Sequence, residues 1–113
     1  MAIFYKNQGY DLTTTNLTTV LTINTSSVAI IKEIAVTNDD NTAHTLDYFF
    51  YDYSTSTSYK FFHTNVPADS HENAVHNALI LEEGDYLQFQ ADSADKISGQ
   101  ISYALLTRSG ENG

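Results

Sequence analysis

The sequence predicts an all-β protein: a single antiparallel β-sandwich, jelly-roll-like, with about eight strands over residues 1–113. Three observations predict it. Thr, Ser, Tyr, Phe, Ile and Val recur along the chain, and no apolar stripe repeats with the period of a helix. Short candidate strands alternate with turn-forming clusters at a spacing of about 8 to 12 residues. A chain of 113 residues suits one domain, with residues 107–113 as a polar tail.

The clearest strand covers residues 86–91, where Leu87 and Phe89 alternate with polar side chains, as a strand with one buried face requires. The same patterns predict strands near residues 3–8, 18–23, 29–37, 45–53, 58–66, 75–81 and 96–107. Turns are expected between them, at residues 24–27, 38–41 and 54–57, and at a loop that carries Pro67.

The run Glu82-Glu83-Gly84-Asp85 raises the possibility of an acidic site. A hydrolytic carboxylate pair needs two groups that face each other across a cleft, which neighbours on one turn are not expected to do. Gly84 supplies the positive φ that many tight turns need, and the Asp85 side chain can bond to nearby backbone. We interpret the run as a solvated turn before a strand.

Two predicted strands are aromatic on both faces. In residues 45–53, Leu46, Tyr48 and Phe50 can fill the core, so the opposite set must be covered by something else. In residues 58–66, two consecutive phenylalanines are expected to face opposite ways. Exposed aromatic stripes usually mark a protein interface or a ligand platform. The alternative is a bulge that turns both sets into one core. The predicted interface residues are Phe49, Tyr51, Tyr53, Phe61 and Phe62.

The histidines do not form a known metal motif. His71 and His76 resemble the H-E-x-x-H signature of zinc proteases, but they are five positions apart instead of four. With His63 and Glu72 they offer cupin-type ligands, yet the close H-x-H pair of cupins is missing. The run at 38–41 lacks the pattern of a calcium loop and is read as a hairpin turn. We predict no catalytic, cofactor-binding or metal site. The alternative for these histidines is a cupin-like metalloenzyme.

Charge and composition exclude several partners. Five basic residues against 14 acidic ones give a net charge of −9, which disfavours direct contact with nucleic acid or an anionic membrane. The chain has no cysteine, so it can form no disulfide and offers no thiol nucleophile. The opening residues do not read as a secretory signal, and no segment approaches a membrane-spanning length. We expect a soluble protein of the cytoplasm.

Four segments follow one another in a distinctive order: NTSSVAIIKEIAVTN (24–38), NVPADS (65–70), ALILEEGDYLQFQA (78–91) and KISGQISYALLTR (96–108). This order, over residues 18–108, resembles small β-sandwich structural proteins of tailed bacteriophages. Those proteins share an "I-x-x-I-x-V-x-N" strand, a "V-P" turn, an "L-x-x-G-D-x-(L)-x-(F/V)-x-A" hairpin and a closing "S-Y" strand. The matching positions are Ile31, Ile34, Val36, Asn38, Val66, Pro67, Leu81, Gly84, Asp85, Leu87, Phe89, Ala91, Ser102 and Tyr103.

The resemblance implies a non-enzymatic virion protein that decorates or cements the capsid or forms part of the neck or tail. Its expected partners are further copies of itself, in a homo-oligomer, and other virion proteins such as major capsid, neck or tail subunits. The competing prediction is a carbohydrate-binding or host-receptor-recognition module, because aromatic rings on a sheet can stack on sugars. Eight tyrosines favour that alternative, and the absence of tryptophan counts against it.

Overall fold

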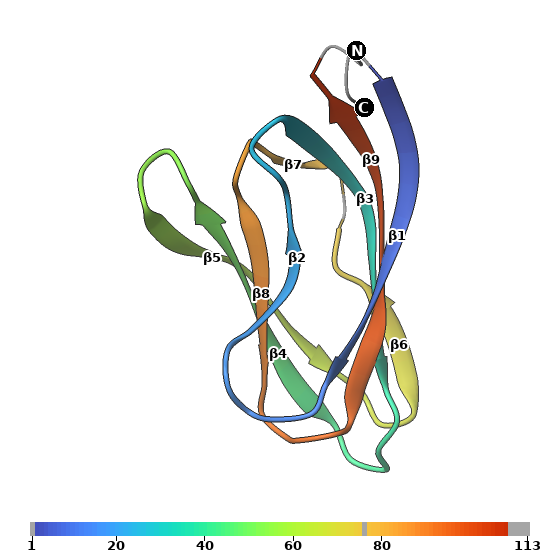
Figure 1. The fold of residues 1–113 in the computed structure, drawn as a ribbon. Coiled ribbons are helices and arrows are strands. Elements are labelled where there is room, and N and C mark those ends of the chain that lie inside the picture. Colours follow the sequence, from blue (N-terminus) through green and yellow to red (C-terminus); the bar gives the residue numbers. More distant parts are fainter. Residues whose placement is uncertain (1, 76, 109–113) are drawn as a thin grey trace.

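The computed structural model describes residues 2–75 and 77–108 of the chain. Within these residues, nine strands form two antiparallel sheets that pack face to face (Figure 1). The predicted β-sandwich is therefore confirmed. The described residues contain no helix with the length and apolar character needed to cross a membrane.

The two sheets have the strand order of a jelly roll. The first sheet has the order β1, β9, β3, β6, and β7 also pairs with β3; the second has the order β2, β8, β4, β5. β6 and β7 both pair with the same edge of β3 and together take one position in the first sheet. The nine strands therefore fill the eight positions of a jelly roll. The strand bounds are β1 (Ala2–Leu12), β2 (Thr18–Thr22), β3 (Ser27–Asn38), β4 (His44–Asp52), β5 (Thr57–Val66), β6 (Ser70–Asn73), β7 (Leu79–Leu81), β8 (Tyr86–Ala91) and β9 (Ile97–Thr107).

The core lies between the sheets and contains the residues that alternation assigned to it, except that Phe50 is half-buried and packs against the core from its border. Leu46, Tyr48, Leu87 and Phe89 are fully buried. The Tyr48 and Phe89 rings meet edge to face with centroids 5.0 Å apart. Burial of each such side chain stabilises the fold by about 1.5–3 kcal/mol. Burial also raises the pKa of Tyr48 to about 12, so its hydroxyl stays neutral and bonds to the Thr64 hydroxyl at 3.0 Å.

The segment between β5 and β8 differs from the prediction, which was wrong here. Its sequence predicts one strand at 75–81, but the strand there is limited to β7, and β6 forms earlier, in a segment predicted to be a loop. Residues 70–73 (SHEN) have little intrinsic strand preference and pair because the edge of β3 is available. At the end of β6, the N–H of Val75 donates to the Asn73 side chain at 3.0 Å instead of to a backbone carbonyl of a neighbouring strand.

The turn at 38–41 is also different from the prediction. It does not close a hairpin, because β3 belongs to the first sheet and β4 to the second. The Asn38 side chain explains the departure: its amide donates to the carbonyls of Val66 at 3.0 Å and Pro67 at 3.2 Å, on the chain that leaves the second sheet. The side chain is 1% exposed, so these bonds join the two sheets at one end of the sandwich.

Candidate interaction surface

The outward face of the second sheet has aromatic side chains on its two inner strands, β4 and β8. Tyr51 of β4 lies opposite Tyr86 of β8, and their rings stack with centroids 4.6 Å apart and planes 9° from parallel. Phe49 lies two positions before Tyr51 on β4, so its side chain emerges on the same face. All three residues are half-buried. Phe49, Tyr51 and Tyr86 are named the outer aromatic cluster below.

Polar and charged side chains border the outer aromatic cluster. Phe49 lies opposite Gln88 on β8 and Lys60 on β5. Asp47, one row further along β4, contacts His63 and forms an ion pair with the Lys60 ammonium at 3.1 Å. The hydrogen bond with His63 lowers the pKa of Asp47 below its ordinary value. An aromatic centre with a polar border is the composition typical of protein interfaces.

Tyr53 is not part of this cluster, because it lies past the end of β4 and rests on the acidic turn. Its ring covers Gly84, where an added Cβ would lie 2.6 Å from the ring. The Tyr53 side chain is 57% exposed. It forms one wall of an open groove of about 570 Å³ that both glutamates of the turn also line. Tyr53 therefore adds a second exposed aromatic site at one end of the sheet.

The turn has the backbone geometry predicted from its sequence, but it is not solvated throughout as predicted, because Asp85 is buried. Gly84 adopts a φ of +83°, which favours glycine. Asp85 is 3% exposed, and its carboxylate accepts the backbone N–H groups of Glu82 at 2.8 Å and Tyr53 at 2.9 Å. The predictions for Gly84 and Asp85 are confirmed. Asp85 joins the turn to the end of β4, a partner that the sequence did not indicate.

The turn does bring carboxylates together, contrary to the sequence-based argument. Oxygen atoms of Asp52, Glu82 and Asp85 lie within 4.8 Å of one another, the only such group of potential metal ligands in the described residues. These oxygens could bind a divalent cation. However, both Asp85 oxygens already accept backbone N–H groups. Asp52 accepts from the Ser54 amide and hydroxyl, and the hydroxyl contact lowers its pKa. These hydrogen bonds close the two turns, and they explain why the three carboxylates lie together.

Phe61 and Phe62 do not face opposite ways as expected. A bulge shifts the register of β5 against β4, so that Phe62 lies opposite Tyr48 and Phe61 is the extra residue. Both phenylalanines pack against the core. Their ring centroids lie 6.2 Å and 5.6 Å from that of Tyr48. Of the five predicted interface residues, Phe49 and Tyr51 therefore share the outer face, while Phe61 and Phe62 lie half-buried beside the core.

The cupin-type histidines are not brought together among the described residues. His63 lies on β5 beside Asp47. His71 and Glu72 are consecutive on β6, so their side chains point to opposite faces of the sheet. His71 is thus on a strand. His76 lies outside the described residues. No described pair among these four residues belongs to a group of potential ligands.

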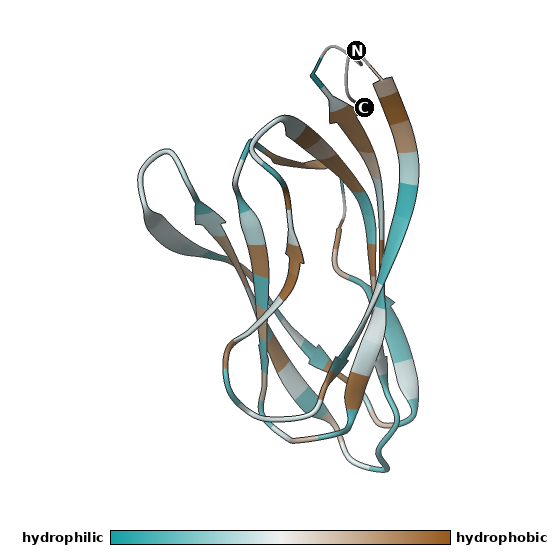
Figure 2. Cartoon of the chain, in the orientation of Figure 1, coloured by the Kyte–Doolittle hydropathy of each residue, from teal (hydrophilic) through white to brown (hydrophobic). Residues whose placement is uncertain are grey.

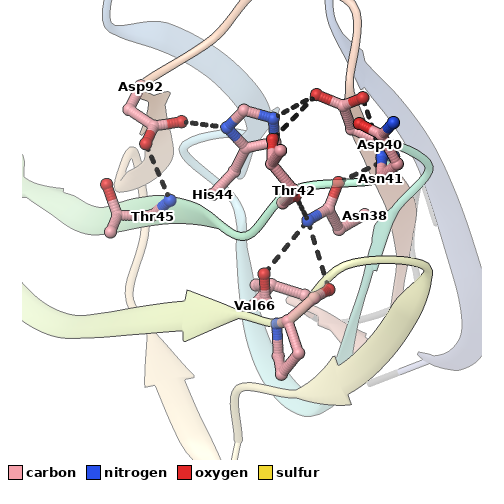
Figure 3. Close-up of polar contacts among 9 residues, drawn as sticks. Asn38, Asp40, Asn41, Thr42, His44, Thr45, Val66 and Asp92 are labelled. Atoms are coloured by element: carbon pink, nitrogen blue, oxygen red, sulfur yellow. Dashed lines mark hydrogen bonds and ion pairs between the residues drawn. The ribbon is translucent and has the colours of Figure 1, made fainter.

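His44 forms a polar clamp that the sequence analysis missed. Its Nε2 lies 2.7 Å from the Asp40 carboxylate and its Nδ1 lies 2.9 Å from that of Asp92 (Figure 3). The other Asp92 oxygen accepts the N–H of Thr45 at 3.1 Å. Both ring nitrogens face carboxylates, which favours the imidazolium form, and the bond to Asp40 raises the pKa of His44. The clamp connects the β3–β4 and β8–β9 turns.

Two solved structures share this fold over nearly the whole chain. A chain of the Bacillus endospore appendages, described as disulfide-linked pili, aligns with a TM-score of 0.56 and 14% identity, over 95% of this chain and 89% of that chain. A chain from the acidic-stable capsid of the Helicobacter pylori bacteriophage KHP30 aligns with a TM-score of 0.57 and 7% identity, over 96% of this chain and 90% of that chain. No protein-family model and no curated protein matches the sequence. At these identities the likeness is one of fold.

The described surface offers groups that can bind a partner through apolar contacts and hydrogen bonds. The outer aromatic cluster offers ring faces and edges, and its border offers amides, one ammonium and one carboxylate. Tyr86 is the functional candidate that the sequence analysis missed. The alternation of residues 86–91 already placed it on the outward face, but only the pairing of β8 with β4 brings it to Tyr51.

Proposed function

We propose that this chain is a non-enzymatic structural protein of a tailed-phage virion, which decorates or cements the capsid or forms part of the neck or tail. The observation that carries the proposal is the outer aromatic cluster on a sheet face that no other described strand covers. Half-buried aromatic rings gathered on one face are a favourable centre for a protein contact, because their burial against a partner releases water from a large apolar area.

Three further observations support the proposal. The same fold occurs in a chain from a phage capsid and in a chain from a pilus, both of which are parts of assemblies. The order of sequence motifs resembles that of phage structural proteins. A net charge of −9 keeps free copies soluble before they assemble. Because the chain has no cysteine, its contacts in a particle use no disulfide, unlike the disulfide links named for the pili.

The polar border suggests what the partner surface offers. Lys60 and Asp47 form an ion pair at 3.1 Å beside Phe49, so an incoming subunit meets a neutral pair next to an aromatic centre. A partner with an apolar centre and hydrogen-bonding groups around it fits this arrangement. Further copies of the chain and the major capsid, neck or tail subunits are the proposed partners.

Binding to particles tests the proposal. The purified chain is added to particles assembled from the same genome with its gene deleted, and the bound fraction is measured by co-sedimentation. Wild type is expected to bind, and Tyr51→Ala is expected to bind at least about tenfold more weakly. Tyr59→Ala is the matched control, because the Tyr59 ring is also stacked on a neighbouring ring and is accessible, but it lies on the inward side of β5. Failure of wild type to bind any part of the particle would overturn the proposal.

A carbohydrate-binding module is the second candidate. The Tyr51–Tyr86 stack lies beside Gln88, and aromatic faces next to amides are groups that bind sugar rings and their hydroxyls. Glycan arrays followed by calorimetry with host polysaccharide test this candidate. It predicts saturable binding that Tyr51→Ala and Tyr53→Ala abolish. Absence of binding to any glycan, together with binding to particles, would leave the virion proposal alone.

A further inference from the structure

β1 presents a long, free backbone edge. It forms one side of the first sheet, pairs through its whole length with β9, and has no strand on its other side among the described residues (Figure 1). Its 11 residues contain no proline, and its pairing with β9 contains no bulge. The unpaired N–H and C=O groups along such an edge are a template for adding another strand.

The other sheet edges carry the features that prevent strand addition. β5 is interrupted by the bulge at Phe61 and carries Lys60 beside it. β2 has five residues and a bulge at Val20. β6 and β7 have four and three residues. Short length, bulges and lysine all disfavour edge-to-edge pairing. Of the described edges, β1 is the one that is both long and free of a bulge, and Lys6 is its only lysine.

Three consecutive apolar side chains of β1 are exposed: Ile3 is 55% exposed, Phe4 44% and Tyr5 85%. Successive residues of a strand point to opposite faces, so Phe4 lies on the inward side and its two neighbours on the outward side. A partner that docked on one face of the sheet would cover only one set. An added strand places cross-strand neighbours on both faces, and it alone covers all three.

The outward part of this region continues as an apolar surface across the sheet. Figure 2 shows hydrophobic colouring at the same end of β1, β9, β3 and β7. The strand register aligns these residues in two rows, and neither row contains an acidic side chain. The rows are Ile3, Leu106 and Val28, and Tyr5, Ala104, Ile30 and Ile80. Both rows end at the free edge of β1, where an added strand would continue them.

A second copy of the chain fits this edge by its charge. Residues 2–10 contain Lys6 and no acidic residue, although the whole chain has a net charge of −9. Two copies of β1 can therefore lie side by side without bringing carboxylates together, and each offers the other an unpaired edge with the same exposed apolar side chains. We infer that β1 pairs antiparallel with β1 of a second copy, so that the first sheet continues across a symmetric dimer. This inference does not depend on a role in a virion.

Pairing of this kind has a fixed geometry. Residues that lie opposite each other in a sheet point to the same face, so inward side chains of one copy meet inward side chains of the other. In a symmetric antiparallel pair, one residue near the axis then lies opposite its own copy, with the Cα atoms about 4.5–5.5 Å apart. That separation is within the range of about 4.4–6.8 Å that a disulfide requires.

Sedimentation velocity at about 50 µM tests the dimer, because a dimer with a micromolar dissociation constant is mostly formed at this concentration. Wild type is expected to sediment as a dimer. Phe4→Glu and Tyr5→Glu are each expected to weaken it at least about tenfold, since on either face the added strand would bury a carboxylate against apolar side chains. Ile80→Glu is the control, because Ile80 is 52% exposed in the same row but lies on β7, away from the edge. A monomeric wild type would overturn the inference, as would dissociation by Ile80→Glu and not by Phe4→Glu.

Cross-linking tests the same contact, and each variant changes only one side chain of β1. Because the chain has no cysteine, each variant with one cysteine placed from residue 3 to residue 8 carries a single thiol. Oxidation is expected to give a disulfide-linked dimer at one of these positions, with Ser58→Cys on β5 remaining monomeric. If no position on β1 cross-links faster than Ser58→Cys, the edge pairing is wrong. Melting temperatures close to wild type identify the variants that are folded.

Discussion

Tyr10 of β1 hydrogen-bonds to the backbone carbonyl of Ala35 on β3, 2.8 Å away, although β9 lies between the two strands. Gly99 of β9 makes this crossing possible. A Cβ at residue 99 would lie 1.8 Å from the Ala35 oxygen and 2.7 Å from the Tyr10 hydroxyl. Burial raises the pKa of Tyr10 well above its ordinary value, so the hydroxyl keeps the proton that it donates. Because Gly99 has no side chain, Tyr10 reaches across β9 and links β1 to β3.

Gly99→Ala should destabilise the fold by about 3 kcal/mol, because the methyl group must displace either the β3 backbone or Tyr10. Gly9→Ala is the matched control on the neighbouring strand, where an added Cβ would meet nothing nearer than 3.9 Å. Urea denaturation of both variants measures the difference. Equal stabilities would show that Tyr10 does not cross β9 as described.

Gly84→Val should lower stability by about 1–3 kcal/mol, because a β-branched side chain is strained at positive φ. The melting temperature is then expected to fall by several degrees, at about 4–8 °C per kcal/mol. The contact with the Tyr53 ring adds to the cost. Glu82→Gln should change little, since it leaves the Glu82 backbone N–H that Asp85 accepts. Thermal denaturation that ranked the two variants the other way would contradict the reading of this segment as a turn.

The His44 clamp should make stability depend on pH. The pKa of His44 is raised from 6.5 by the bond to Asp40, so the stabilisation is complete below the unfolded value and is lost as the pH rises through the folded one. The pKa of Asp40 is lowered by the same bond, so its contribution is present above the ordinary value and is lost as the pH falls through the lowered one. The clamp is therefore strongest in mild acid.

His44→Gln tests this pH dependence. Between about pH 6 and pH 9 the melting temperature of wild type should fall relative to that of the variant, and the two should converge at the alkaline end. His71→Gln, at an exposed histidine on β6, should follow wild type. A constant difference between wild type and His44→Gln across this range would rule out an imidazolium at residue 44.

The stack of Tyr51 on Tyr86 should contribute little to folding. A double-mutant cycle with Tyr51→Ala, Tyr86→Ala and both together is expected to give a coupling of about 0.5–1.5 kcal/mol, as for other aromatic pairs. Each variant should remain folded, since both rings lie on the outward face and are half-buried. A coupling of zero would mean that the rings do not stack in solution.

The elements that were predicted correctly are those set by local patterns. Residues 86–91 alternate cleanly, so burial of Leu87 and Phe89 followed from the period of a strand. Gly84 and Asp85 are turn residues for reasons that lie within the turn. The sandwich followed because about eight such strands in one short chain can bury their apolar faces only against each other.

The elements that were missed depend on contacts between distant residues. The bulge that places Phe61 and Phe62 together is a property of how β5 pairs with β4. β6 is a strand because β3 offers it an edge. His44 and Asp92 are 48 positions apart, and nothing in either local sequence indicates the other. For the candidate surface, Phe49 and Tyr51 could be predicted from alternation, whereas Tyr86 required knowledge of the strand order.

The most direct test of a structural role is electron microscopy of intact particles assembled from the genome that encodes this chain. A structural role in the virion predicts an ordered density at symmetry-related positions on the capsid, neck or tail, into which the sandwich of Figure 1 fits with the outer aromatic cluster against a neighbouring subunit. Particles that are complete without such a density, and that show no trace of the chain by mass spectrometry, would contradict it.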